Sequence, residues 1–156
     1  MDNQGCEHKG VMGILSGAAC KLSWLPPLLA RITIGFIFIQ SGWGKLHHLD
    51  KVVGFFTELG IPAPQIQAPF VACVEFLGGI LVLVGFFTRF ASIPLIGTMV
   101  VAILTAKRAD ITDISDLFAM AEYLYIVLLT WLVIKGAGAV SLDRMICSRW
   151  HKKEGI

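Results

Sequence analysis

Four long apolar segments follow one another along the chain, separated by shorter polar stretches. They cover residues 25–46, 68–88, 90–106 and 117–135. Each is long enough, or nearly so, to cross the hydrocarbon core of a bilayer as an α-helix. The pattern therefore predicts an all-α protein, an integral membrane four-helix bundle.

The connection between the first two spans has an apolar pattern of its own. In the stretch DKVVGFFTELGIP, one face of a helix would carry Val52, Val53, Phe55, Phe56 and Leu59. Asp50 can cap the start of this helix, and Gly60 with Pro62 can end it. We expect a short helix lying in the outer membrane interface.

The spans divide the chain into three parts: an N-terminal leader (1–24), a transmembrane domain (25–143) and a basic tail (144–156). Within the leader, the sequence VMGILSGAAC, ending at Cys20, faintly resembles a signal peptide with a lipid-modified cysteine. Its apolar stretch is short, so we interpret the leader as a cytoplasmic segment lying on the membrane. No internal repeat is evident.

Composition supports the membrane class. Hydrophobic residues make up 56% of the chain and charged residues 15%, and the mean hydropathy is +0.75. These values are far from the balance of a soluble domain. The net charge is only +2 and the basic residues are scattered, bunching only near the C-terminus. Nucleic acid is therefore not an expected partner.

The basic residues also predict the orientation. Four spans place both termini on one side, which would carry eight basic residues, while the other side would carry four. The two groups are Lys9, Lys21, Arg89, Lys135, Arg144, Arg149, Lys152 and Lys153, against Lys45, Lys51, Lys107 and Arg108. By the positive-inside rule, both termini of this multi-pass protein are expected to be cytoplasmic.

Charged residues inside the spans are the candidate site. With a rise of about 1.5 Å per residue, Glu75 falls near mid-membrane, Lys45 near the outer surface and Glu122 about two turns below it. Arg31 lies about two turns in from the cytoplasm. A charge at the bilayer centre costs about 2.5–3.5 kcal/mol, so Glu75 should face the bundle interior and pair with Lys45 or Arg31. Glu122, at a depth close to that of Lys45, would compete for it.

Two interpretations of this polar cluster remain open. The four charges could form a buried ion-pair network that only locks the helices together, or they could carry out proton chemistry. In the outer loop AKRADITDISD, Asp116 is placed to cap the fourth span. Its acidic neighbours Asp110 and Asp113 are interpreted as part of a solvated loop rather than as cation ligands.

Other reactive residues give weaker patterns. The four cysteines form no C-x-x-C pair, which argues against thiol–disulfide exchange. His47 and His48 are adjacent, so on a helix they point about 100° apart and cannot both ligate one haem iron. Either could bind a metal or a quinone head group near the outer surface, or simply be solvated. No resident metal or cofactor is predicted in the chain itself.

Sequence motifs across residues 25–143 resemble those of the DoxX family of small four-helix bacterial membrane proteins. The segments are LLARITIGFIFIQSGWGKL, FFTELGIPAP, VEFLGGILVLVGFFTR and AEYLYIVLLTWLVIKGAGAVSLD. The matching positions are Arg31, Gly35, Phe38, Gly42, Lys45, Gly60, Pro62, Glu75, Gly79, Gly85, Arg89, Glu122, Gly138, Ser141, Leu142 and Asp143. Of these, Gly35, Gly42, Gly79, Arg89, Gly138 and Asp143 are expected to be structural, the glycines through close helix packing.

The resemblance implies a protein of the bacterial inner membrane that is a subunit or partner of a membrane redox system, linked to quinone or to sulfur transfer. In that hypothesis a partner protein supplies the electron carrier, while Lys45, Glu75 and Glu122 handle protons. The alternatives are a small transporter or permeability protein and a structural scaffold without catalysis. Transporters often contain broken helices, and Pro94 is the only proline that we expect to distort a span. A homo-oligomer also remains open.

Overall fold

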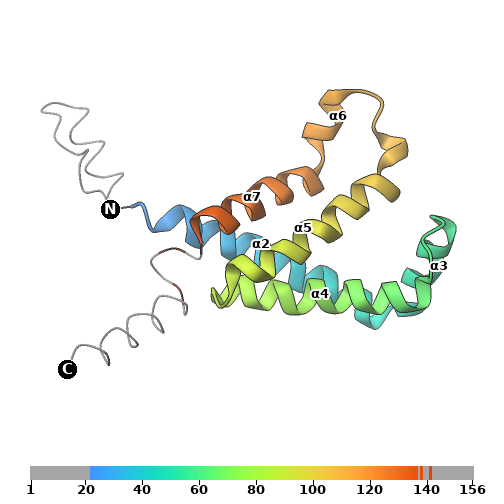
Figure 1. Ribbon diagram of the computed structural model, residues 1–156, viewed down its shortest axis with the longest axis horizontal. Helices are drawn as coiled ribbons and strands as arrows, with labels where there is room; N and C mark the ends of the chain where they lie inside the picture. The colour runs from blue at the N-terminus through green and yellow to red at the C-terminus, as the bar shows by residue number, and fades with distance from the viewer. Residues whose placement is uncertain (1–21, 137, 139–140, 142–156) are drawn as a thin grey trace, which may run out of the picture.

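The computed structural model describes residues 22–136, 138 and 141 of the chain, and this part is helical throughout its regular structure. Residues 1–21 of the predicted leader and the whole basic tail lie outside the described residues, as do Leu142 and Asp143. The helices are α2 (Leu25–His47), α3 (Leu49–Glu58), α4 (Pro64–Val84), α5 (Thr88–Thr105), the 3-10 helix η1 (Arg108–Asp110), α6 (Ile114–Ala119) and α7 (Ala121–Lys135) (Figure 1).

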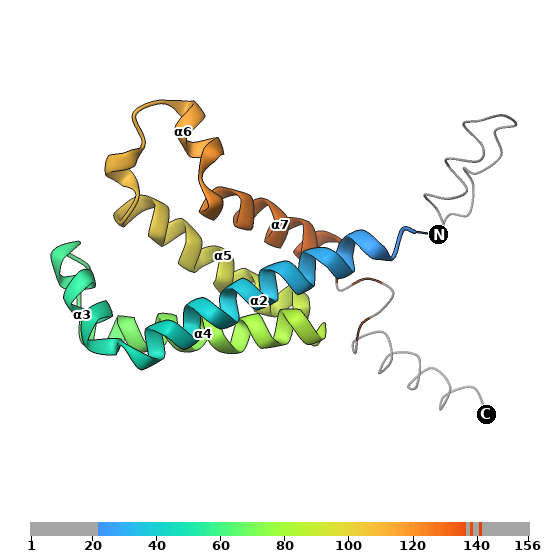
Figure 2. The same ribbon diagram turned by 180° about the vertical axis from the view of Figure 1, so that it is seen from behind.

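Four of these helices, α2, α4, α5 and α7, pack as a bundle. Helices α2 and α4 run side by side along most of their length, and α5 packs on both α4 and α7 (Figures 1 and 2). The two pairs diverge toward the end that carries α3 and α6. The bundle is therefore tightly packed at the opposite end, where α2 begins, and more open near α3.

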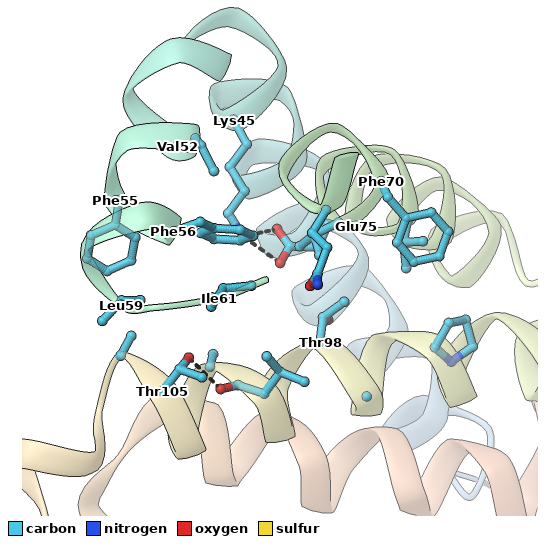
Figure 3. Close-up of a pocket in the computed structure, with 18 of the residues that line it drawn as sticks. Lys45, Val52, Phe55, Phe56, Leu59, Ile61, Phe70, Glu75, Thr98 and Thr105 are labelled. Atoms are coloured by element: carbon cyan, nitrogen blue, oxygen red, sulfur yellow. Dashed lines mark hydrogen bonds and ion pairs between the residues drawn. The ribbon is translucent and has the colours of Figure 1, made fainter. Parts of the chain in front are cut away.

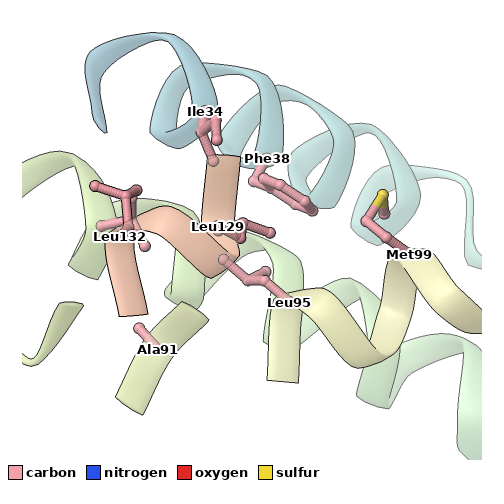
Figure 4. Packing of buried hydrophobic residues seen from close by; sticks show 8 residues of the cluster. Ile34, Phe38, Ala91, Leu95, Met99, Leu129 and Leu132 are labelled. Atoms are coloured by element: carbon pink, nitrogen blue, oxygen red, sulfur yellow. The ribbon is translucent and has the colours of Figure 1, made fainter. Parts of the chain in front are cut away.

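The apolar core ties the two pairs together. It draws its side chains from all four bundle helices, and Figure 4 shows several of them facing one another: Ile34, Phe38, Val82, Ala91, Leu95, Met99, Leu129 and Leu132. Many other large apolar side chains are exposed on the outside of the bundle. This inversion of the soluble pattern fits a protein whose outer surface meets lipid.

Glycines set the spacing between α2 and α4. A Cβ built on Gly79 would lie 2.8 Å from the backbone nitrogen of Ile39, and one on Gly35 would lie 2.7 Å from the Cβ of Leu83. A Cβ on Gly42 would lie 2.7 Å from the Cα of Phe76. These separations are too short for any side chain, so the expected close packing by these three glycines is confirmed.

The fourth predicted span differs from the prediction. Residues 117–135 do not form one helix, because the chain is extended at Met120 (φ −73°, ψ 137°), between α6 and α7. Helix α7 has 15 residues and so reaches only about 22 Å. Among the described residues, three helices, α2, α4 and α5, are long and apolar enough to cross a membrane.

Proline positions also differ. Helix α4 begins at Pro64, one turn before the predicted span, so Pro69 lies inside it as Pro94 lies inside α5. The expectation that Pro94 alone would distort a span is therefore wrong. Both prolines remove a backbone hydrogen bond from the helix that contains them.

The helices fall into two halves of the same design. Each half consists of two bundle helices joined through a short helix. The halves are α2–α3–α4 and α5–α6–α7. In the first half, Arg31 donates hydrogen bonds to the carbonyls of Val82 and Leu83 near the end of α4, both at 3.1 Å. In the second half, Arg89 donates to the carbonyl of Ile134 near the end of α7 at 3.4 Å.

The glycine that follows each capped helix completes this likeness. Gly85 and Gly136 both have positive φ values, 76° and 78°, although their ψ values of 37° and −171° differ. A Cβ on either glycine would contact the arginine of its own half. The two halves thus share a helix-end cap built from an arginine and a glycine. No internal repeat is evident in the sequence, so this likeness is structural. Arg89 was expected as a basic residue of the cytoplasmic side and as a structural residue of the family motif, and in the structure it binds the end of α7.

The start of α6 carries a different cap from the one predicted. Asp113 is the N-cap residue and accepts a hydrogen bond from the Ile114 N–H, while Asp116 accepts from the Asp113 N–H and from Thr112. Hydrogen bonds from the Thr112 hydroxyl and the two backbone N–H groups lower the pKa of Asp116 below its usual range. Asp116 therefore supports the cap from the third helical position.

Gly42→Ala tests the close approach of α2 and α4. The added methyl group would meet the backbone of Phe76, so we expect a loss of about 1–3 kcal/mol in the free energy of unfolding. Gly44→Ala in the same helix is the control, because a Cβ there has nothing within 4 Å. Unfolding in mixed detergent micelles measures both. Equal stability of the two variants would contradict the proposed steric limit.

Candidate functional site

A buried ion pair lies at the centre of the candidate site. The Lys45 ammonium lies 2.5 Å from Oε1 and 2.6 Å from Oε2 of Glu75. The Glu75 side chain is 1% exposed, whereas that of Lys45 is 29% exposed. The prediction that Glu75 pairs with Lys45 is confirmed, and the residual exposure of Lys45 follows from its long side chain reaching outward.

Ser41 is a third member of the site that the sequence reading missed. Its hydroxyl donates a hydrogen bond of 2.8 Å to Oε2 of Glu75. Ser41 lies four residues before Lys45 on α2, so the two side chains share one helix face. That spacing was available in the sequence, but a serine in an apolar segment is not distinctive.

Close packing of α2 and α4 positions these groups. Gly42 lies next to Ser41 on α2 and contacts the backbone of Phe76, the residue after Glu75. Gly79, one turn beyond Glu75 on α4, contacts the backbone of Ile39. The helices therefore approach most closely around the carboxylate, which brings Glu75 within reach of two side chains of α2.

Arg31 is separate from this pair. It is 3% exposed and hydrogen-bonds to the end of α4. Along α2 it lies 14 residues from Lys45, or about 21 Å. The structure thus divides the predicted polar cluster into an ion pair near the middle of α4 and a helix-end cap.

Glu122 is also not brought to Lys45. It lies in the first turn of α7 and is half-buried, and no ion pair or hydrogen bond of its side chain is found in the part of the chain that the structure describes. The break at Met120 starts a new helix just before Glu122. Helix α7 also packs mainly against α5, whereas Lys45 is on α2.

The two histidines are exposed at the end of α2. His47 Nδ1 lies 3.0 Å from the Trp43 carbonyl oxygen, and His48 Nδ1 lies 3.2 Å from that of Gly44. The His47 and Trp43 ring centroids are 4.2 Å apart. Among residues 22–136, 138 and 141, no three His, Cys, Asp or Glu side chains come together as a metal site would need. The hypothesis of a head-group or metal contact stays a prediction.

The remaining motif glycine within the described residues, Gly138, lies against the start of α2 at the tightly packed end of the bundle (Figure 1). Gly138 has a φ of 79°, and a Cβ on it would lie 2.9 Å from Cγ of Pro27 in α2. The segment after α7 therefore lies against the start of α2. Asp143, the last motif residue, lies outside the described part of the chain.

A cavity of about 570 Å³ opens beside the ion pair (Figure 3). Helix α3 forms one wall, the first half of α4 a second and the later part of α5 a third. The lining is mostly apolar and includes Val52, Phe55, Phe56, Leu59, Ile61, Phe70, Val71, Val74, Pro94, Val101 and Ala102. Lys45 and Glu75 belong to the same lining, as do Lys51, Gln67, Thr98 and Thr105.

This arrangement gives the predicted short helix a second role. The helix is confirmed as α3, although none of its residues is buried. Of its predicted apolar face, Val52, Phe55, Phe56 and Leu59 line the cavity in Figure 3, whereas Val53 does not belong to the lining. The cavity combines a long apolar wall with a few polar groups at defined positions, which is how sites for small apolar ligands are built. The lining is complementary to a ligand with an apolar body and one polar head.

Removing the partners of the ion pair should have unequal effects. Lys45→Met leaves the buried Glu75 carboxylate without its cation and should cost about 3–5 kcal/mol of unfolding free energy. Glu75→Gln should cost less, because the partly exposed Lys45 ammonium can still reach water. A double-mutant cycle in detergent should give a coupling of about 1–3 kcal/mol.

The exposed pair Lys107–Asp110 is the control for this cycle. Its side chains are 42% and 61% exposed and lie 3.4 Å apart, so its coupling should be below about 1 kcal/mol. Equal coupling energies for the two pairs would show that burial does not strengthen the Lys45–Glu75 interaction.

Comparison with known proteins agrees with this architecture. The sequence pattern of the DoxX family matches residues 27–108. The chain is 28% identical to the inner membrane protein YqjF of Escherichia coli over 130 residues, which is 83% of this chain and 98% of that protein. It is 31% identical to the protein named "Putative oxidoreductase CatD" of Bacillus subtilis over 121 residues, covering 76% of this chain and 85% of the relative.

A third relative, the inner membrane protein YphA of Escherichia coli, is 33% identical over 122 residues, or 75% of this chain and 87% of that protein. No solved structure matches the chain significantly. The family pattern covers more than half of the chain, and these relatives are matched over most of their length. The chain belongs to the DoxX family of membrane proteins.

Proposed function

We propose that this protein is the integral subunit of a quinone-linked redox system of the inner membrane. The observation that carries the proposal is the Lys45–Glu75 ion pair in the wall of an apolar cavity between α3, α4 and α5. In this proposal all four bundle helices cross the membrane, and the end with Arg31 and Arg89 lies on the cytoplasmic side with both termini.

The cavity residues fit a quinone. Its ring and the first part of its tail are apolar and would contact the aromatic and aliphatic lining, and its carbonyl oxygens need hydrogen-bond donors. The Lys45 ammonium is such a donor and lines the cavity. A bound quinone would supply the two-electron, two-proton chemistry of the system.

The residues of this chain would bind the ring and hold a proton. Glu75 can take up a proton at a carboxylate oxygen, with Ser41 holding the carboxyl group in place in both states. When Glu75 is charged, Lys45 compensates the charge; when Glu75 is neutral, Lys45 reaches toward water. A carboxyl group with two such states at an apolar cavity suits the uptake or release of protons.

Electrons would come from a partner protein that carries a flavin, a metal centre or a sulfur-transfer site. The name of the relative CatD, as an oxidoreductase, supports a redox setting for the family. Affinity purification of the tagged chain from its native membranes in mild detergent tests for this partner. A stoichiometric redox protein would support the proposal. Recovery of the chain alone, under conditions that preserve other membrane complexes, would argue against it.

Glu75→Gln should reduce quinone-dependent electron transfer in those membranes at least tenfold, because the variant keeps the shape of the side chain but cannot take up the proton. Glu58→Gln, which changes an exposed carboxylate of α3 outside the cavity lining, should leave the rate unchanged. The rates are measured with equal amounts of folded protein, as shown by thermal unfolding. A Glu75→Gln variant with full electron transfer would contradict the proton role.

The transporter hypothesis has support from one feature of the structure. Pro94 of α5 lines the cavity and interrupts the hydrogen bonding of that helix, as the broken helices of transporters do. Proteoliposomes that contain only this chain separate the two functions. Glu75-dependent solute flux without any partner would favour transport over the redox proposal.

A further inference from the structure

The charges in the cavity lining do not balance. Three charged side chains line the cavity within the described residues: Lys45, Lys51 and Glu75. Lys45 and Glu75 neutralise each other as an ion pair. Lys51 therefore gives the cavity one additional positive charge.

Lys51 has no acidic partner within 4 Å among the residues that the structure places. The acidic residues of its own helix, Asp50 and Glu58, are exposed and do not line the cavity. No other aspartate or glutamate besides Glu75 occurs in the lining. The positive charge of Lys51 is thus left for a ligand to compensate.

Helix α3 directs this lysine to the same face as its aromatic wall. Lys51, Phe55 and Leu59 follow one another at intervals of four residues, so they form one stripe on α3. All three belong to the cavity lining, and Figure 3 labels Phe55 and Leu59 on the α3 side of the cavity. A cation beside an apolar wall is a pattern that suits an amphiphilic ligand.

The dimensions of the cavity suit a ligand with a single apolar chain. Along α5 and its C-cap residue, the lining extends from Pro94 to Ala106, which is 12 residue steps or about 18 Å. The cavity volume of about 570 Å³ is in the range of small-molecule sites. A polar head near Lys51 and an apolar chain between α4 and α5 would use both parts of the lining.

We propose that the cavity selects apolar molecules with an anionic head group, and that Lys51 of α3 provides the selectivity by pairing its ammonium group with the anionic head. The inference rests on the proposed function in one respect, that the cavity is the ligand site, and it narrows the ligand class. Two heads share the required chemistry: the ionised ring hydroxyl of a hydroxyquinone, and the carboxylate of a fatty acid.

A matched pair of probes tests the inference on the full-length protein in nanodiscs of neutral lipid. The first is an alkyl hydroxynaphthoquinone, which is anionic at neutral pH. The second is the alkyl methylnaphthoquinone with the same chain, which is neutral. We expect the Kd of the anionic probe to be about fivefold lower than that of the neutral probe. Because Lys51 is exposed, this difference corresponds to the largest free energies measured for solvent-exposed ion pairs, about 1 kcal/mol.

The variant Lys51→Gln should abolish this preference and leave the Kd of the neutral probe unchanged. The control is Lys107→Gln, which removes an exposed lysine outside the cavity lining and should keep the preference. Added salt should weaken the preference of the wild type, because the lysine is in contact with solvent. Circular dichroism of each variant confirms that it is folded.

The outcomes separate this inference from the proposed function. If the wild type binds both probes equally, or prefers the neutral one, the anionic preference is overturned while the quinone proposal stands. If neither probe binds, the proposed function itself fails at this cavity. If the anionic probe binds more tightly, competition identifies the preferred head group. Bound hydroxynaphthoquinone is displaced either with palmitate or with more of the unlabelled hydroxynaphthoquinone. A lower displacing concentration for palmitate favours a carboxylate, and a lower one for the hydroxynaphthoquinone favours the ionised quinone.

Discussion

The carboxylate of Glu75 constrains the arrangement of α2 and α4. A buried carboxylate in an apolar bundle has to be paired or protonated, and here Lys45 and Ser41 of α2 both reach it. That contact requires the two helices to approach within the space left by Gly42 and Gly79. The same approach aligns α2 with α4 over most of their length. The ion pair and the glycines therefore depend on each other and together hold the two helices in contact.

The second pair of helices is joined to the first by apolar packing, not by charge. Leu95 of α5 and Leu129 of α7 meet Ile34 and Phe38 of α2 in the core. This packing lies away from α3, and the pairs separate toward the other end (Figures 1 and 2). The cavity exists because α4 and α5 diverge there and α3 covers the space without filling it. Its position beside the ion pair therefore follows from how the two halves are joined.

The repeated arginine–glycine caps close the opposite end of the bundle. Arg31 and Arg89 each bind the carbonyl end of the last helix in their own half, where the helix dipole favours a positive charge. In the proposed orientation, both arginines lie at the cytoplasmic end of the bundle. One end of the molecule is thus held by backbone caps, while the other is open and carries the cavity. This difference between the two ends would let a ligand reach Glu75 from the α3 side.

The all-helical class, the membrane setting, the amphipathic α3 and the need of Glu75 for a basic partner on α2 were determined by the sequence alone, whereas the choice of Lys45 over Arg31 came from the structure. Apolar segments of spanning length can satisfy their backbone only as helices in lipid, and a mid-membrane acid needs a basic partner of matching depth. The close-packed glycines were predictable for the same reason, since small residues on facing helices allow backbone contact.

Only the tertiary structure decided the rest. It separated Arg31 from the ion pair, started α7 at Ala121 so that Glu122 is not brought to Lys45, and added Ser41. It also formed the cavity in which α3 places Lys51. The reason is physical: depth along a helix can be counted from the sequence, but the rotation of each helix about its axis and the angle between helix pairs depend on side-chain packing among all of them.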